Sequence, residues 1–274
     1  MNKVLTIEHP KKAMVISDIH GFWQALQKIT ELPEYHNPEY QLIFLGDYTD
    51  GGASNPRDPK KVIDFITDEV LNHDALLVHG NHDDMLLGTA NNQMDKFDNW
   101  SYNGRSQTLR ELGIPDSDDI EVVSSYLKDL LPDYLNVLNN APYLIEDQNR
   151  IFVHAGINWY LSDYKKTTRE DMVWLRQEYL FVTNVPLGFA TPGHPVPAKL
   201  IHQNQTDKVI FTGHTPASLI TGDAAGFPAK LESVRYGLPR YVIDGGSHGT
   251  PNAGLNVVIV DADGSIIRTE KLFG

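Results

Sequence analysis

The stretch Ala13-Met-Val-Ile-Ser-Asp18-Ile-His20 decides the fold of this chain. Its apolar run is typical of a strand buried on both faces, and two polar side chains follow where that strand ends. The pattern recurs in Gly46-Asp47-Tyr-Thr-Asp50, Gly80-Asn81-His82-Asp83, His154-Ala-Gly156 and Gly213-His214-Thr215, each of which also follows an apolar run. An open α/β sheet places its chemistry at the carboxyl ends of its strands, so we expect the five blocks to meet at one site.

The residues between these blocks predict the order of strands and helices. Strands are expected at 13–17, 42–45 and 75–79, with one helix that opens near Gly21 and another from about Pro59 to Leu71. Further strands are expected at 143–145, 151–153, 209–212, 241–243, 257–260 and 265–269. Strands that alternate with helices indicate an α/β fold, in which two packed sheets carry helices on their outer faces.

One region departs from this alternation. From about residue 94 to residue 141, acidic segments carry Leu and Tyr at helical spacing, which predicts a helical insertion. No internal repeat or low-complexity tail separates the insertion from the rest. We therefore expect a single domain over residues 1–274 that contains the insertion at about 94–141.

Composition narrows the class of protein. The chain has 274 residues, of which 41% are hydrophobic, as in ordinary globular proteins. Its 23 basic and 36 acidic side chains give a formal charge of −13, which argues against nucleic acid and anionic membranes as partners. There is no cysteine, so a metal must be held by carboxylate, imidazole and amide groups. Neither a signal peptide nor a membrane-spanning run is recognisable, so a cytoplasmic location is expected.

The first two blocks have the spacing of a metal site. Asp18 and His20 are two residues apart, so in extended backbone their side chains point the same way and can hold one ion. Gly46 lets the backbone bend, so that the Asp47 carboxylate can bridge to a second ion. Two neighbouring cations need such a shared negative ligand because they repel each other. An isolated pair of this kind is more often part of a surface loop, and only the ordered set favours a site.

The remaining blocks supply neutral ligands for the second ion. Asn81 offers a hard amide oxygen, although Gly80-Asn81 alone would be read as a turn. His154 and His214 each follow an apolar run next to glycine, which would let their imidazoles reach the ion from strand ends. Either histidine alone would more often be structural, but together with the other blocks they favour ligation.

Taken in order, the five blocks resemble those of the calcineurin-like metallophosphoesterases. The second and third blocks are similar, more narrowly, to the phosphoprotein-phosphatase branch in its bacterial and phage-like form. The resemblance extends from Ala13 to about Val260 and implies the four-layer αββα sandwich of that family. It assigns Asp18, His20 and Asp47 to the first ion, Asp47, Asn81, His154 and His214 to the second, and His82 and Asp50 to proton donation. Two divalent cations are implied, with manganese expected and iron or zinc as alternatives.

The resemblance is incomplete at the groups that would hold phosphate. In the family an arginine that clamps the phosphate normally follows the aspartate at position 50, but here Gly51 and Gly52 follow it. Arg176 matches the segment that supplies another phosphate-binding arginine and is the expected principal cation, with Asn81 as a further contact. Arg105 is the weaker substitute, since an exposed surface arginine is the alternative interpretation of that position. His248, in a glycine-rich loop, is a candidate at the mouth of the site.

These residues predict hydrolysis of phosphomonoesters. A hydroxide that bridges the two ions would attack phosphorus, and His82, oriented by Asp50, would protonate the departing oxygen. The presence of Asp50 favours a phosphatase acting on phosphoserine, phosphothreonine or phosphotyrosine in proteins. The alternatives are a hydrolase of dinucleoside polyphosphates, such as diadenosine tetraphosphate, or of other small phosphoesters. A catalytically silent binding or regulatory module is the alternative from another class.

Overall fold

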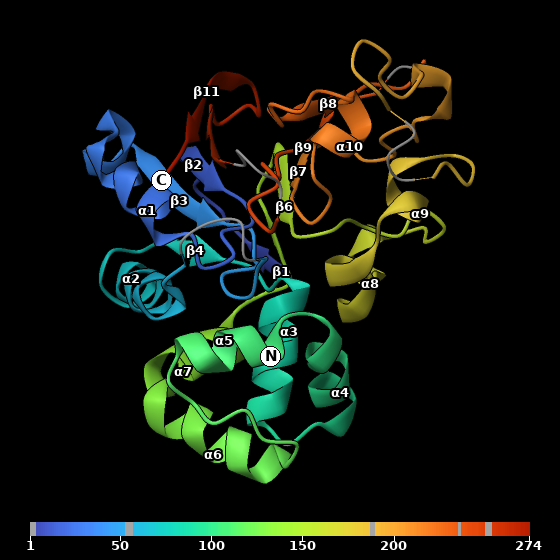
Figure 1. Cartoon of the computed structure of the whole chain (residues 1–274). Coiled ribbons are helices and arrows are strands. Elements are labelled where there is room, and N and C mark those ends of the chain that lie inside the picture. The colour runs from blue at the N-terminus through green and yellow to red at the C-terminus, as the bar shows by residue number, and fades with distance from the viewer. Residues whose placement is uncertain (1–3, 53–56, 187–189, 235–236, 250–253) are drawn as a thin grey trace.

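Two mixed sheets form the centre of the computed structural model, which describes residues 4–52, 57–186, 190–234, 237–249 and 254–274 (Figure 1). The six-stranded sheet has the order β1-β5-β6-β7-β9-β8, and the five-stranded sheet has the order β11-β10-β2-β3-β4. The strands of the first are β1 (Val4–Thr6), β5 (Leu144–Glu146), β6 (Arg150–Val153), β7 (Val209–Thr212), β8 (Ala229–Leu231) and β9 (Arg240–Val242). Those of the second are β2 (Lys12–Ile16), β3 (Tyr40–Phe44), β4 (Leu76–Leu77), β10 (Leu255–Val260) and β11 (Ile266–Leu272).

The parallel strands of each sheet lie side by side. In the second sheet, β2 pairs with β3 and β3 with β4 in parallel. In the first sheet, β6 pairs with β7 and β7 with β9 in parallel. Antiparallel strands such as β10 and β5 complete the sheets. The carboxyl ends of the parallel strands therefore gather at one edge of each sheet, which is the place expected for the site.

Side-chain alternation explains why the sheets stack. Along β2, Ala13 and Val15 join a buried cluster that also contains Phe152 and Phe211 of the first sheet. Met14 and Ile16, on the other face, belong to a cluster formed with helices. Successive side chains of a strand point to opposite faces, so one apolar strand packs against a sheet on one side and against helices on the other.

The helices cover the outer faces of the two sheets and complete the four layers, which confirms the expected α/β sandwich (Figure 1). Those beside the second sheet are α1 (Trp23–Leu26) and α2 (Pro59–Asn72), and those beside the first are α8 (Arg169–Trp174), α9 (Gln177–Leu180) and α10 (Ser218–Thr221). Short 3-10 turns occupy Gln27–Glu31, Pro33–His36, Tyr164–Lys166 and Ala198–Leu200. Helix α2 begins as its sequence predicts: the Asp58 side chain accepts from the Lys61 N–H, and Pro59 occupies the first turn.

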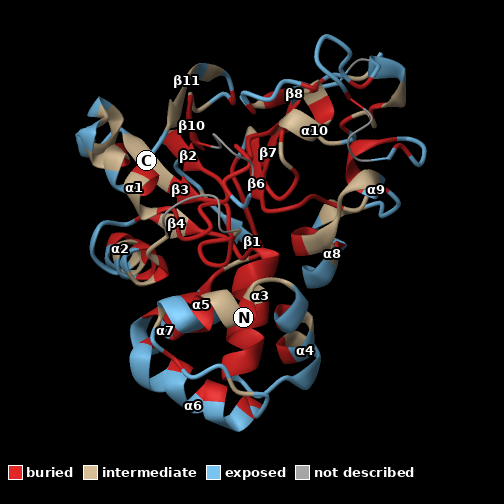
Figure 2. Cartoon of the chain, in the orientation of Figure 1, coloured by how far each residue is buried: buried red, intermediate tan, exposed pale blue. Residues whose placement is uncertain are grey.

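A third group of helices lies at the carboxyl ends of the strands. It contains α3 (Asn81–Ala90), α4 (Met94–Tyr102), α5 (Arg105–Glu111), α6 (Ile120–Leu130) and α7 (Pro132–Asn140). Helices α4 to α7 lie within residues 94–141, where the sequence predicts a helical insertion, whereas α3 was not expected. Figure 2 shows α3 buried in the middle of this group. Buried residues of α3 to α7 share one apolar cluster with Met14 and Phe44, so the group belongs to the same core as the second sheet.

Other sequence expectations differ in detail. Strand β4 is shorter than the expected strand at 75–79, and the helix expected after Gly21 continues as a 3-10 turn. Strands β1 and β8 were not expected; each has only three residues, and the side chains of β1 are largely exposed. Among the described residues no helix is long and apolar enough to cross a bilayer.

Candidate metal centre

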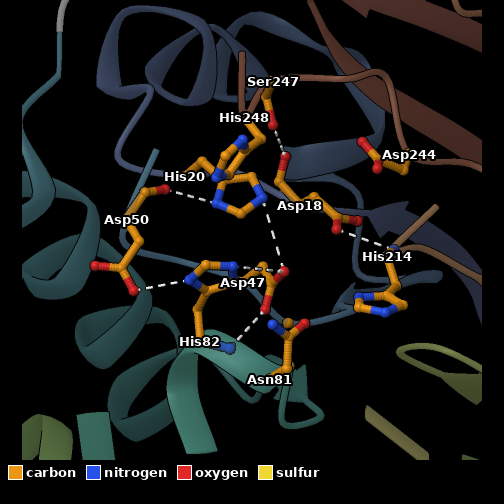
Figure 3. A network of polar contacts seen from close by, with 12 residues as sticks. Asp18, His20, Asp47, Asp50, Asn81, His82, His214, Asp244, Ser247 and His248 are labelled. Carbon is orange, nitrogen blue, oxygen red and sulfur yellow. Dashed lines mark hydrogen bonds and ion pairs between the residues drawn. The ribbon is translucent and has the colours of Figure 1, made fainter. Parts of the chain in front are cut away.

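The six expected ligands come from loops that directly follow five parallel strands. Asp18 and His20 follow β2, Asp47 follows β3, Asn81 follows β4, His154 follows β6 and His214 follows β7. All six are buried. Figure 3 shows five of them, with His154 unlabelled, turned toward a common centre around Asp47. Strands that are far apart in the sequence thus deliver one polar cluster where the two sheets meet.

Two overlapping groups of ligand atoms share one carboxylate. The ligand atoms of Asp18, His20 and Asp47 all lie within 4.8 Å of one another, and those of Asp47, His154 and His214 do the same. Asp47 belongs to both groups, so its carboxylate is positioned to bridge two ions. This arrangement agrees with the division into two ligand sets that the family resemblance implies.

Asn81 joins the second group through a short contact. Its Oδ1 atom lies 3.1 Å from His154 Nε2. The residue is the first of α3, and the N–H of the next residue, His82, donates to Asp47 Oδ1 at 3.1 Å. The positive end of the helix therefore faces the shared carboxylate, where it favours negative charge.

The imidazoles present free nitrogens to the centre. His20 Nδ1 lies 2.6 Å from the Asp50 carbonyl and His154 Nδ1 lies 2.7 Å from the Leu45 carbonyl, so both Nδ1 atoms carry the hydrogen and donate. Burial holds the pKa of His20 well below its ordinary value, so its ring is neutral and its Nε2 is available as a ligand. Burial alone would lower the pKa of His154, but Asp47 outweighs it and raises the pKa to about 9, so a cation at His154 Nε2 would take the place of a proton. The two Nε2 atoms lie 3.7 and 3.4 Å from Asp47 Oδ2, beyond normal hydrogen-bond distance.

The donor set fits divalent cations. His214 Nε2 is buried and has no hydrogen-bond partner, a state that costs about 1–3 kcal/mol unless a ligand satisfies the atom. Burial, together with the nearby His154, holds the pKa of His214 well below its ordinary value, so the ring is neutral and able to ligate. Oxygen and imidazole ligands suit manganese, iron or zinc. The residues present therefore fit the two ions that the sequence implies.

The ligand loops adopt a rare backbone conformation. His20, Asp47 and His214 have φ values of 51°, 57° and 63°, and Asp50 has 57°. Side-chain-bearing residues seldom occupy this left-handed region, and they cluster at functional sites when they do. In this conformation the backbone turns sharply after each strand, and the side chain points toward the common centre.

Two glycines leave room for the carboxylates. A Cβ atom on Gly80 would collide with the Asp47 carboxylate, and one on Gly213 would collide with that of Asp18. Each glycine belongs to a different block from the carboxylate it admits. The blocks are therefore complementary in shape as well as in chemistry.

Asp83 has a positioning role that the sequence did not reveal. Its carboxylate accepts from the N–H groups of Gly80, Asp47 and Tyr48 at 2.9, 2.8 and 3.2 Å. Burial, with the neighbouring Asp47, raises its pKa to about 7. The only available signal was its place at the end of the third block.

His82 and Asp50, the residues expected to act as an acid pair, are joined by a hydrogen bond. His82 Nδ1 donates to Asp50 Oδ2 at 2.8 Å, and its Nε2 lies 3.9 Å from Asp47 Oδ2, facing the ligands. Burial alone would lower the pKa of His82, but Asp47 and Asp50 outweigh it and raise the pKa to about 9. The ring is thus protonated at neutral pH, as a general acid requires.

The helical insertion holds this pair in place. Trp100 Nε1 of α4 donates to Asp50 Oδ2 at 2.7 Å, and the Thr108 hydroxyl of α5 donates to Asp50 Oδ1. Sequence reasoning assigned no role to either residue. Their contacts make the insertion part of the site rather than a separate surface feature.

The predicted substrate contacts differ in their surroundings. Arg176 Nη1 donates to the carbonyl of His214 at 2.7 Å, so its guanidinium lies beside the second group of ligands. Arg105 lies 3.3 Å from Asp118 and 4.1 Å above the Phe97 ring, and these partners engage its guanidinium. Arg105 is buried, so the alternative interpretation as an exposed surface arginine is wrong.

His248 lies at the exposed edge of the site, beside two of its histidines. Its ring centroid is 4.8 Å from that of His20 and 5.8 Å from that of His82 (Figure 3). The preceding Ser247 donates its hydroxyl to the Asp18 carbonyl, and the buried Asp244 accepts from the Gly246 N–H at 2.7 Å. The loop after β9 therefore forms one wall of the centre, which sequence reasoning reached only through His248.

Curated relatives match most of the chain. The asymmetrical bis(5'-nucleosyl)-tetraphosphatase PrpE of Bacillus mycoides is 26% identical over 249 residues, which covers 81% of this chain and 89% of the relative. The symmetrical bis(5'-nucleosyl)-tetraphosphatase of Vibrio cholerae is 27% identical over 158 residues, which covers 57% of this chain and 49% of the relative.

Solved structures share the fold. A crystal structure provisionally described as a diadenosine tetraphosphatase superposes with a TM-score of 0.61 at 16% identity and covers 100% of both chains. A protein serine/threonine phosphatase of Saccharomyces cerevisiae superposes with a TM-score of 0.50 at 14% identity and covers 100% of this chain and 84% of that one. At these identities the likeness concerns the fold alone.

A family-level sequence match covers most of the chain. The sequence profile of the calcineurin-like phosphoesterases matches residues 11–248, a range that contains all five blocks and every ligand described above. This chain therefore belongs to the calcineurin-like phosphoesterase family.

Proposed function

We propose that this chain hydrolyses dinucleoside polyphosphates such as diadenosine tetraphosphate. The observation that carries the proposal is the match to asymmetrical bis(5'-nucleosyl)-tetraphosphatases over 81% of this chain and 89% of their length. The preference for a phosphoprotein rested on Asp50. Its bonds to His82 and the insertion serve proton donation to either class of substrate.

Aromatic side chains beside the metal centre support a nucleotide substrate. The Trp174 ring meets the His214 ring edge-on with centroids 5.9 Å apart. Trp174 and Tyr160 line two adjoining pockets, of which one also contains Arg176. The Tyr160 ring is 82% exposed. A nucleobase stacked on such a ring gains about 1–3 kcal/mol, while the phosphates can extend toward the ligands.

The protein's own groups divide the work of hydrolysis. The clusters around Asp47 would hold two divalent ions, which supply Lewis acidity and lower the pKa of water when bound. Hydrolysis breaks one P–O bond of the anhydride and joins the water oxygen to phosphorus, and a proton delivered to the departing oxygen assists this step. His82 holds that proton on Nε2, and Asp50 keeps Nδ1 protonated and the ring oriented.

The test compares two substrates at equal concentration. Metal-free protein is loaded with manganese and given diadenosine tetraphosphate or a phosphoserine peptide, and products are separated by anion-exchange chromatography. We expect faster cleavage of the dinucleotide, with ATP and AMP as products of asymmetrical cleavage; two ADP molecules would indicate symmetrical cleavage. Faster cleavage of the peptide would overturn the proposal. A manganese-loaded protein that cleaves neither substrate would support the silent module instead.

A further inference from the structure

A guanidinium lies where the side chain of residue 51 would be. A Cβ atom on Gly51 would overlap Nη1 and Cζ of Arg57. The φ of Gly51 is outside the left-handed region, so its backbone would accept other residues. Glycine is therefore needed at this position for space, because Arg57 fills the place directly after the orienting carboxylate of Asp50.

Backbone carbonyls of two loops fix the Arg57 guanidinium. Its Nε donates to Gly52 O at 2.6 Å, and its Nη2 donates to His248 O at 3.0 Å and Ser247 O at 3.2 Å. Gly52 N–H also donates to His248 O at 2.5 Å. The guanidinium thus joins the loop after β3 to the loop after β9, and both loops form walls of the metal centre.

One end of this guanidinium is left without a partner. Arg57 Nη1 is buried and makes no hydrogen bond to the part of the chain that the structure describes. Within the described ranges Arg57 forms no ion pair, because the nearby Asp50 carboxylate is taken by His82, Trp100 and Thr108. A buried charged donor without a hydrogen bond lowers the stability of the folded chain, and a bound anion would supply the missing acceptor.

The location of this charge suits a phosphate group. Arg57 bonds the carbonyl of His248, whose ring lies 4.8 Å from that of His20 in the first ligand group, whereas Arg176 bonds the carbonyl of His214 in the second. Two guanidinium groups therefore flank the centre from different loops. Guanidinium is the side chain best suited to phosphate, because its N–H groups match the oxygen geometry.

We propose that Arg57 is a phosphate-binding residue of this site, whose Nη1 donates to a phosphoryl oxygen of the substrate. Arg57, six positions after Gly51, then supplies the cation that is missing at position 51. The inference rests on phosphoester hydrolysis at this centre, as the proposed function does, but not on which phosphoester is cleaved.

The experiment measures the binding of inorganic phosphate to manganese-loaded protein by titration calorimetry. Arg57→Ala should weaken phosphate binding about tenfold or more, with manganese content unchanged. Gly51→Ala should do the same, because its Cβ pushes the guanidinium aside. The double change Gly51→Arg with Arg57→Ala should recover part of the affinity, since the new side chain starts in the vacated space. Arg110→Ala, an exposed arginine on α5, is the matched control and should bind as the native chain does.

Three outcomes would overturn the assignment. In the first, Arg57→Ala binds phosphate with native affinity. In the second, it loses manganese together with phosphate, which would mean that Arg57 only holds the two loops together. A folded double variant that keeps manganese and recovers nothing would also count against it. Arg57→Lys, which keeps the charge, covers the case in which alanine does not fold, and should bind phosphate with intermediate affinity. A native chain that binds phosphate through Arg57 but ignores diadenosine tetraphosphate would refute the proposed function and leave this inference standing.

Discussion

The metal ligands and the side chains around the entrance to the site reach the same place by different routes. Asp18, Asp47 and His154 follow their strands almost directly, are buried, and are held by bonds to neighbouring loops. Arg57 comes from the segment before α2, and Trp174 and Arg176 come from the ends of two short helices. The inner groups thus depend on the sheets, whereas the outer ones depend on connecting segments. We therefore expect the inner groups to set the reaction and the outer groups to set the substrate.

The largest effect is expected from the shared carboxylate. Asp47→Asn removes the negative charge that two cations need between them, so turnover of every phosphoester should fall to the background rate. The metal content, measured by plasma mass spectrometry after manganese loading, should fall with it. Asp129→Asn, at an exposed position of α6, should change neither quantity. Native turnover in Asp47→Asn, or of the native chain in excess chelator, would contradict the assignment of the reaction to the inner groups.

Removal of the acid should depend on the leaving group. His82→Ala should cost about 10²–10⁴-fold with a phosphoserine peptide, whose alkoxide needs a proton, and much less with an aryl phosphate or a dinucleotide. Asp50→Asn should give the same pattern in milder form, because it disturbs only the orientation of the ring. Steady-state kcat values on the three substrates test this. Equal losses on all of them would remove His82 from proton transfer.

The entrance should affect one substrate and spare another. Trp174→Leu keeps an apolar side chain at a half-buried position but removes the stacking surface. The KM for diadenosine tetraphosphate should rise roughly 5- to 100-fold, as a loss of about 1–3 kcal/mol implies. Constants for p-nitrophenyl phosphate should stay unchanged. Tyr160→Ala should act in the same direction, and Tyr102→Ala, an equally exposed tyrosine on the insertion, is the control. Parallel losses on both substrates would mean that Trp174 supports the metal ligands instead.

A remote ion cluster should give the smallest effect and separate stability from catalysis. Glu146 on β5 bonds Lys165, Tyr164 and Lys208, and although burial alone would raise its pKa, these partners lower it from 4.5 to about 2. Its stabilisation is complete above pH 4.5 and is lost as the pH falls from 4.5 toward 2, because the unfolded carboxylate is protonated first. After allowance for solvent screening, Glu146→Gln should lower the free energy of unfolding by about 1–2 kcal/mol at pH 7.

Urea unfolding at pH 7, 5, 4 and 3 should show the two curves converging toward low pH. The kinetic constants at pH 7 should be those of the native chain, since the cluster lies on a strand outside the ligand loops. A stability difference that persists unchanged at pH 3 would mean that packing rather than charge holds Glu146 in place.

Helix α3 illustrates what local sequence could not predict. It contains asparagine, histidine, two aspartates, glycine and threonine, which are poor helix formers, and its opening Gly80-Asn81 is typical of a turn. Nearly all of its residues are buried by the surrounding helices. Tertiary packing therefore stabilises a helix that the residues alone would not form.

The sequence by itself determined most strands of the two sheets and the residues that we propose as metal ligands. Apolar runs that end in Asp, Asn or His specify both at once, because a parallel strand delivers whatever follows it to the same edge. Only the tertiary structure decided which side chains support and surround those ligands. Trp100 and Thr108 reach Asp50 from an insertion, and Arg57 occupies the space over Gly51. Such partners are brought together by the packing of separate segments. The spacing of residues along the chain therefore does not predict that Arg57 fills the space beside Gly51.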